Sequence, residues 1–202
     1  MSREQIINCK LSTICKMFEF IKDWQRKRLL RQLEHKDSNR NKKIDNIAQA
    51  KSIGIIFQVG DENDWNLIYH FAKLMEKEGK TVAMIGLQDS ETELDYIITH
   101  SNTLLCKEKD DFDYWGVPKK DLVEKFAKNH FELLIDTTEE PNFFGQYIAL
   151  SCDADLKICY ASAEELEDNV KIFDMMIQGE EPLNLRDYLN QVVKYLKMIK
   201  KE

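Results

Sequence analysis

The spacing of hydrophobic residues changes once along the chain, near residue 50. Before that point, apolar side chains recur every three or four residues, as they do along one face of an α-helix: Ile7, Leu11, Ile14, Phe18 and Ile21. Met17 and Trp24 widen this face, so we expect a helix from about residue 5 to about residue 36. The segment KDSNRNKK that follows is typical of a polar linker, because Ser and Asn side chains compete with the helical backbone for hydrogen bonds.

Beyond residue 50, short runs rich in Ile, Val and Leu alternate with helical stripes. The runs predict parallel strands near residues 53–59, 81–87, 132–136 and 156–160, and NTLLCK predicts a weaker strand. The stripes predict helices after Asp61, from Pro118, over NFFGQYIALSC and over LNLRDYLNQVVKYLKMIKK. We therefore expect an α/β fold, with a doubly wound, mainly parallel Rossmann-like sheet and an N-terminal basic amphipathic helix.

The segment VKIFDMMIQ predicts the last strand of this sheet. Only about ten residues separate it from the strand before, whereas a parallel connection requires about a dozen or more. We therefore expect the last strand to lie antiparallel at an edge.

Charge divides the chain where the hydrophobic pattern changes. Residues 1–43 contain twelve Lys or Arg and five Asp or Glu, a balance of +7. Residues 44–202 contain seventeen Lys or Arg and thirty-one Asp or Glu, a balance of -14. The two balances add up to the net charge of the chain, -7. We expect a basic helical arm with its linker over residues 1–43 and a single acidic Rossmann-like domain over residues 44–202.

The apolar face of the arm is too large to remain in water, so we expect a partner to cover it. One interpretation is a protein surface, which is either the chain's own body, a second copy or another protein. Another is an anionic membrane surface, with basic side chains at the lipid headgroups. The acidic body disfavours nucleic acid. The candidate interaction residues are Ile14, Phe18, Ile21, Trp24 and Arg28, together with Trp115 in the loop DYWGVP.

Several classes of chemistry find no support in the sequence. Five scattered cysteines form no C-x-x-C pair, and no secretory signal or long apolar run is present, which indicates reduced thiols in a cytoplasmic protein. The four histidines lack metal-ligand spacing, and no G-x-S-x-G motif occurs. We therefore assign no catalytic residue, no metal ligand and no cofactor.

The stretch KSIGIIFQVGDENDW joins a strand, a glycine and an acidic helix start. Many α/β proteins build phosphate sites from a strand, a glycine turn and a helix, but a single glycine matches neither the dinucleotide-binding motif nor the Walker motif. Asp61 is expected to cap the helix, with Asp64 in its first turn. These carboxylates would repel a phosphate, so we do not expect one here.

Doubly wound sheets bind ligands at the carboxyl ends of their strands. The candidate ligand-binding residues are therefore Asp61, Glu62, Asp136 and Thr137, which follow two of the predicted strands. If the two strand ends are neighbours, the three carboxylates could bind Mg²⁺. The segment LLIDTTEEP resembles the acceptor strand of response-regulator receivers, although no lysine follows Tyr160 where that family requires one.

Four segments together resemble an uncharacterised family of small α/β proteins from Bacteroidetes: KSIGIIFQVGDENDWNLIYHFAKLMEKEGKTVAMIGL, DFDYWGVPKK, FELLIDT and DADLKICYA. This resemblance covers nearly the whole chain and implies the fold and a bacterial cytoplasmic setting, with no known activity. Residues 131–161 are also similar to part of the acceptor-side Rossmann domain of heptosyltransferase-like glycosyltransferases. The glycine of that family's last turn is missing, and we find no second Rossmann domain for a sugar nucleotide.

These observations leave the function unknown. The function they favour is that of a non-enzymatic cytoplasmic domain that binds partners through its surface or its arm. The alternative is a small-molecule- or Mg-dependent enzyme with a site at the strand carboxyl ends around Asp61 and Asp136.

Overall fold

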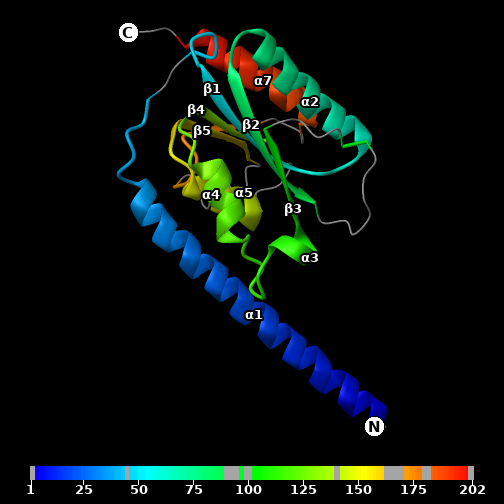
Figure 1. The fold of residues 1–202 in the computed structure, drawn as a ribbon. Coiled ribbons are helices and arrows are strands. Elements are labelled where there is room, and N and C mark those ends of the chain that lie inside the picture. Colours follow the sequence, from blue (N-terminus) through cyan, green and yellow to red (C-terminus); the bar gives the residue numbers. More distant parts are fainter. Residues whose placement is uncertain are drawn as a thin grey trace.

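A computed structural model describes residues 3–43, 46–88, 96–97, 102–138, 142–161, 171–178 and 183–199, with side chains in the first helix described from residue 16 onward. The described strands form one sheet in the order β3-β2-β1-β4-β5-β6, and every neighbouring pair is parallel (Figure 1). They are β1 Ser52–Gln58, β2 Thr81–Gln88, β3 Thr103–Lys107, β4 Phe131–Asp136, β5 Ala154–Tyr160 and β6 Met175–Ile177. The predicted doubly wound α/β fold is confirmed.

Helices cover both faces of this sheet. They are α1 Arg3–Asp37, α2 Glu62–Lys77, α3 Glu108–Asp111, α4 Lys120–Ala127, α5 Phe143–Ser151 and α7 Leu185–Met198. Helices α2 and α7 lie on one face, and α4 and α5 lie on the other, with α1 outside them (Figure 1). Each face has its own buried apolar cluster, because the side chains of a strand alternate between the two faces.

The four strands that the sequence predicts as parallel are the four central strands of the sheet. Their interiors are almost fully buried: in β1, for example, Ile53, Ile55, Ile56 and Phe57 are all 0% exposed. A parallel sheet is covered on both faces, so its strands read as continuous apolar runs, and this is why the sequence predicted them.

The prediction for the last strand was wrong in its direction. β6 pairs with β5 in parallel, with Ile158 opposite Met175 and Tyr160 opposite Ile177. The strand begins only at Met175, later than the apolar run that predicted it, so residues 161–174 are available for the return connection. A parallel crossover needs about a dozen residues or more, and this segment is long enough. A strand beginning at residue 170, as predicted, would have left too few.

The structure also accounts for the two ends of α2. Asp61 caps its start, as predicted, because its side chain accepts a hydrogen bond from the backbone N–H of Asp64. Gly79 follows the end of the helix with φ of 87°, a conformation that favours glycine.

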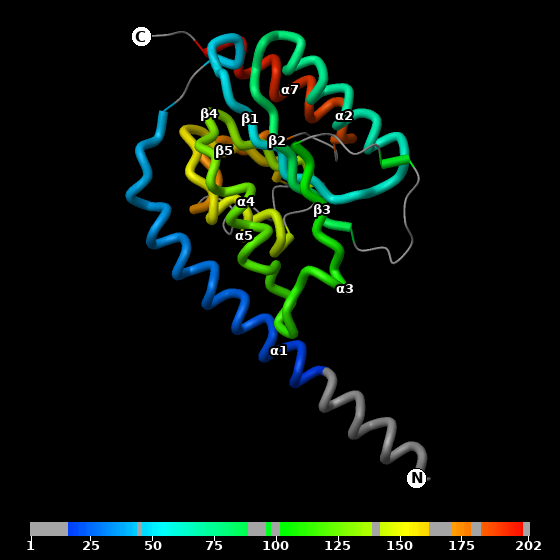
Figure 2. Tube along the Cα trace, viewed as in Figure 1, coloured from blue at the N-terminus to red at the C-terminus, as the bar shows by residue number. Residues whose placement is uncertain are grey.

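Helix α1 runs along the outer side of the layer that contains α4 and α5 (Figures 1 and 2). Leu30 and Leu33 pack, half-buried, against the apolar cluster of that layer, which includes Phe144 and Ile148. One side of the arm is therefore covered by the chain's own body.

Candidate functional site

The first candidate site lies where β1 and β4 end. These two strands are neighbours, and the strand order reverses between them, so their carboxyl ends mark the switch point of the sheet. Asp61 and Glu62 are exposed there, and the Asp61 carboxylate accepts the 2.9 Å bond from the Asp64 backbone. Burial and then the nearby charge of Asp61 raise the pKa of Asp64. Of the two predicted residues that follow β1, Asp61 is thus the N-cap of α2 and Glu62 is its first residue.

The two predicted residues from β4 are buried and hydrogen-bonded. Oδ1 of Asp136 accepts bonds from the backbone N–H and the hydroxyl of Thr138, at 3.0 and 2.9 Å. The Thr137 hydroxyl donates to the Ile56 carbonyl at 2.9 Å, and the Tyr188 hydroxyl donates to the Asp136 carbonyl at 2.8 Å. Burial raises the pKa of Asp136 to about 6, while the two Thr138 bonds act in the opposite direction.

The Asp136 carboxylate faces the first turn of α5. A Cβ on Gly145 would overlap its Oδ2 atom, so only glycine leaves room for the carboxylate there. Asn142 caps the same turn by accepting a 2.8 Å bond from the Gly145 N–H. Within the described ranges, no three His, Cys, Asp or Glu side chains are grouped so that they could hold a metal ion. Asp61, Glu62 and Asp136 are not gathered into such a group, and ligand binding at these strand ends stays a prediction.

A cavity of ≈ 570 Å³ lies at the opposite, amino-terminal edge of the sheet. Its lining includes Ser52, Thr81, Lys125 and His130. His130 contacts the carboxylates of Asp153 and Asp155, and the hydrogen bond to the first of these raises its pKa. Parallel α/β sheets place their ligands at the other edge, so this cavity is the weaker candidate.

The arm contacts the body through the loop that contains Trp115. Nε of Arg26 donates a 2.9 Å hydrogen bond to the Trp115 carbonyl. The Phe18 ring lies 5.0 Å from the Tyr114 ring and 6.4 Å from the Trp115 ring, centroid to centroid. Gly116 has φ of 71° and lies directly against the Arg26 guanidinium, where a Cβ would overlap it. Glycine at this position thus lets the helix approach the loop.

A buried ionic network fixes the C-terminal end of α1 to β5. We call it the ionic clamp; its members are Asp37, Arg40, Lys157 and Asp174. Nζ of Lys157, in the middle of β5, lies 2.6 Å from Oδ1 of Asp37, and the two side chains are 0% and 7% exposed. Arg40 donates to both carboxylate oxygens of Asp174, at 2.8 and 2.7 Å, and to the carbonyl of Ala154 at 2.7 Å.

The electrostatics of the clamp follow from its burial. Burial lowers the pKa of Lys157, although the hydrogen bond to Asp37 opposes this effect. The pKa of Asp174 is lowered, because the bonds from Lys42 and Arg40 outweigh its burial. The clamp was not predicted from the sequence, because Asp37 and Arg40 lie in residues 36–43, which were expected to be a polar linker. The available signal was a lysine inside the otherwise apolar strand LKICY, since a buried lysine needs a carboxylate.

The side of α1 that points away from the body is open. Four large apolar side chains are exposed on it: Phe20 is 72% exposed, Met17 59%, Trp24 52% and Ile21 38%. The same side continues, at helical spacing, into Lys27, Arg28, Arg31 and His35. We call these eight residues the outer face of α1.

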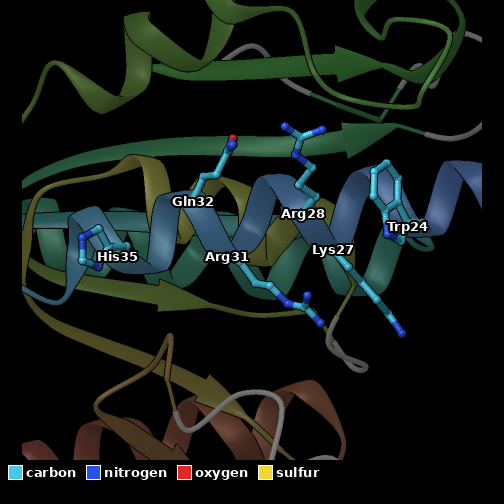
Figure 3. A pocket seen from close by; sticks show the side chains of 6 residues that line it. All are labelled: Trp24, Lys27, Arg28, Arg31, Gln32 and His35. Atoms are coloured by element: carbon cyan, nitrogen blue, oxygen red, sulfur yellow. The ribbon is translucent and has the colours of Figure 1, made fainter.

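The basic half of the outer face borders a shallow cavity of ≈ 470 Å³, whose lining contains no acidic side chain (Figure 3). The Arg28 guanidinium lies 5.7 Å from the centre of the Trp24 ring, which is a cation–π distance. A neighbouring groove of ≈ 240 Å³ runs between α1 and the body. Lys27 and Arg31 of α1 and Lys171 of the body are among the residues that line it.

The structure divides the predicted interaction residues into two groups. Phe18 and Trp115 meet each other at the contact between the arm and the body. Ile21, Trp24 and Arg28 belong to the outer face, and the side chain of Ile14 lies outside the described residues. The apolar face that the sequence predicted as one stripe is therefore covered on one flank and open on the other.

Among the helices of the described chain, none has both the length and the apolar character needed to cross a membrane.

Comparison with known proteins gives a family and no activity. No curated protein and no solved structure matches the chain. One family of unknown function, DUF6913, matches residues 22–199, which include the C-terminal part of α1 from Lys22, the ionic clamp and all six described strands. The chain belongs to the DUF6913 family of unknown function.

Proposed function

We propose that the protein is a non-enzymatic interaction domain, in which the α/β body presents the outer face of α1 to a macromolecular partner. One observation carries this proposal: Met17, Phe20, Ile21 and Trp24 are exposed side by side on a helix that the body holds in place. Soluble proteins expose single apolar side chains routinely, but clusters of large ones mark interaction sites.

The attachment of α1 supports the same proposal. The ionic clamp, the Arg26 bond and the packing of Leu30 and Leu33 anchor the helix by one side. A helix held in this way loses little conformational entropy when a partner binds, so its exposed side is prepared for binding. By contrast, the exposed apolar side chains Leu74 and Met198 lie on α2 and α7, in the other helical layer.

A bacterial, cytoplasmic setting belongs to the same proposal. Cys106, Cys152 and Cys159 are buried free thiols, as expected in a reducing compartment. The resemblance to Bacteroidetes proteins supports a bacterial origin. The local similarity to heptosyltransferase-like enzymes concerns the fold, and we propose no sugar transfer from it.

Site-specific photocrosslinking in living cells tests the interaction. A photoreactive phenylalanine analogue replaces Phe20 on the outer face or, as a control, Leu74 on α2; these side chains are 72% and 52% exposed. The proposal predicts a distinct adduct from position 20 that is absent from position 74, and the mass of the adduct identifies a protein, a second copy or a lipid. Equal labelling at both positions, or none at position 20, would contradict it.

One observation favours a second candidate function, that of an enzyme acting on a small molecule at the switch point. Asp136 is buried there with a pKa raised to about 6, and such perturbed carboxyl groups occur at catalytic sites. A screen of metabolites by thermal shift, comparing the wild type with Asp136→Asn, tests this function. A saturable rise in the melting temperature of the wild type alone would support the enzyme, because a ligand of the native state stabilises it by mass action.

A further inference from the structure

We infer that the outer face of α1 binds an anionic lipid surface, with its apolar half at the acyl boundary and its basic half at the phosphate groups. This inference rests on the proposed interaction function and names the partner. Three features of the described residues carry it: the shape of the exposed side, the order of its side chains and the position of its charges.

The shape of the exposed side suits a flat partner. Phe18, Arg26 and Leu33 contact the body, while Phe20, Trp24 and Arg28 lie on the opposite side of the same helix. The helix is therefore attached lengthwise, and its free side is a straight edge with the body behind it. Amphipathic helices that bind membranes lie along the surface in this way.

The order of the side chains suits the interface between lipid and water. The apolar half contains two aromatic residues, Phe20 and Trp24, and aromatic rings of this kind gather at membrane interfaces. The basic half follows within the next three turns, and the shallow cavity on it has no acidic lining. Figure 3 shows Lys27 and Arg31 leaning to one side of the helix and Arg28 to the other, so the cations border the face along both flanks.

The adjoining groove provides a place for a phosphate group. Lys27 and Arg31 from α1 and Lys171 from the body line it, and all three are exposed. The lining contains one acid, Glu34, against these three cations. The groove thus favours an anion beside the basic half, which the apolar half precedes along the same helix, and a lipid offers a headgroup and acyl chains in the same way.

The acidic body does not prevent this binding. Residues 44–202 carry a balance of -14, but within the described part of the body it is α4 and α5 that lie behind α1, on the side opposite the outer face. A helix is about 10 Å wide, and charges are largely screened beyond about 8 to 10 Å at physiological salt. The attraction of the arm therefore acts at contact, while the repulsion of the body is weakened by distance.

A second copy of the chain fits the outer face less well. Parallel pairing of two outer faces would bring Lys27, Arg28 and Arg31 against the same cations of the partner. Antiparallel pairing would bury those cations against Phe20 and Trp24 with no carboxylate to compensate them. Either arrangement desolvates charge without pairing it, which is costly.

Vesicle sedimentation of the full chain tests the inference. The probes are vesicles of phosphatidylcholine alone and of phosphatidylcholine mixed with phosphatidylglycerol. The variant is Arg28→Glu/Arg31→Glu, and the matched control is Lys194→Glu/Lys197→Glu on α7, which has the same spacing and the same change in charge. Unchanged melting temperatures show that both variants fold.

We expect binding to the anionic vesicles alone, and weaker binding as salt rises. Each cation near such a surface contributes about fivefold to partitioning, so the Arg28/Arg31 variant should lose at least about 25-fold while the control changes by less than about threefold. Equal binding to both kinds of vesicle, an equal loss in the control, or no binding at low salt would overturn the inference. A protein adduct from position 20 together with no vesicle binding would overturn the lipid inference and leave the interaction function standing.

Discussion

Replacing Asp37 with asparagine leaves the Lys157 ammonium buried without the carboxylate that now lies 2.6 Å from it. The Lys157 side chain is fully buried, and breaking a buried ion pair from one side costs about 3 to 5 kcal/mol. We expect about 3 kcal/mol, the lower end of this range, because the amide oxygen of asparagine still accepts a hydrogen bond.

The lost stability can appear as global unfolding of the chain or as detachment of α1 alone, and two measurements separate these outcomes. Asp37 ends α1, so detachment of the helix would let water reach Lys157 without unfolding the sheet. Global unfolding is measured by urea titration, in which the midpoint falls while the m value stays constant. Detachment appears instead as faster amide exchange over residues 16–37 alone.

A double-mutant cycle assigns the loss to the ion pair. Lys157→Met should cost only about 1 kcal/mol, because Asp37 keeps the Arg40 guanidinium 3.3 Å away. The Asp37→Asn/Lys157→Met double variant should recover about 2 kcal/mol relative to the sum of the single changes. The exposed Asp23 on α1 supplies the control, since Asp23→Asn should stay within about 0.5 kcal/mol of wild type. An Asp37→Asn variant as stable as this control, with unchanged exchange in α1, would refute the role of the clamp.

Three further predictions concern the sheet edge and the loop. In the folded chain the Asp136 carboxyl stays protonated up to about pH 6, whereas in the unfolded chain it ionises near pH 4. The stability that the protonated carboxyl contributes is therefore present below about pH 4 and is lost as pH rises through about 6. Asp136→Asn should therefore gain about 2 to 2.5 kcal/mol relative to wild type between pH 4 and pH 7 in urea titrations, and a constant difference would contradict the buried carboxylate. Asp61→Ala should lose about 1 kcal/mol of stability as a lost cap, and millimolar Mg²⁺ should leave the wild-type melting temperature unchanged; a saturable rise would indicate a metal site. Gly116→Ala should cost about 2 kcal/mol and loosen α1, since a Cβ there meets Arg26, whereas Gly79→Ala, with open space around it, should cost about 1 kcal/mol with no change in amide exchange over α1.

The sheet could be predicted because its signal is local. A strand such as SIGIIFQ is apolar at nearly every position, since both of its faces are covered, and Asp61 and Gly79 mark the ends of the next helix. The direction of β6 could not be predicted, because it depended on where a three-residue strand begins. A shift of a few residues changed the length available for the crossover.

The attachment of α1 could not be predicted because it depends on pairs far apart in the sequence. Asp37 and Lys157 are ordinary charged residues until the fold buries them together, and Arg26 reaches a backbone carbonyl that no sequence pattern marks. The spacing of apolar residues predicted a helix and an apolar side, but Phe18 and Ile21 lie on that same predicted side and have different surroundings. The position of the Trp115 loop decides which part of this apolar side is covered.

Hydroxyl-radical footprinting of the full chain in solution tests most directly whether α1 is covered on one side and open on the other. We expect Met17, Phe20 and Trp24 to be oxidised several-fold faster than Leu33 and Trp115, after correction for the reactivity of each residue type. Comparing the two tryptophans with each other removes that correction, since Trp24 is 52% exposed and Trp115 is half-buried beneath the arm. Equal oxidation of Trp24 and Trp115 would show that the helix does not stay on the body, and slow oxidation of Phe20 and Trp24 would show that the outer face is not open.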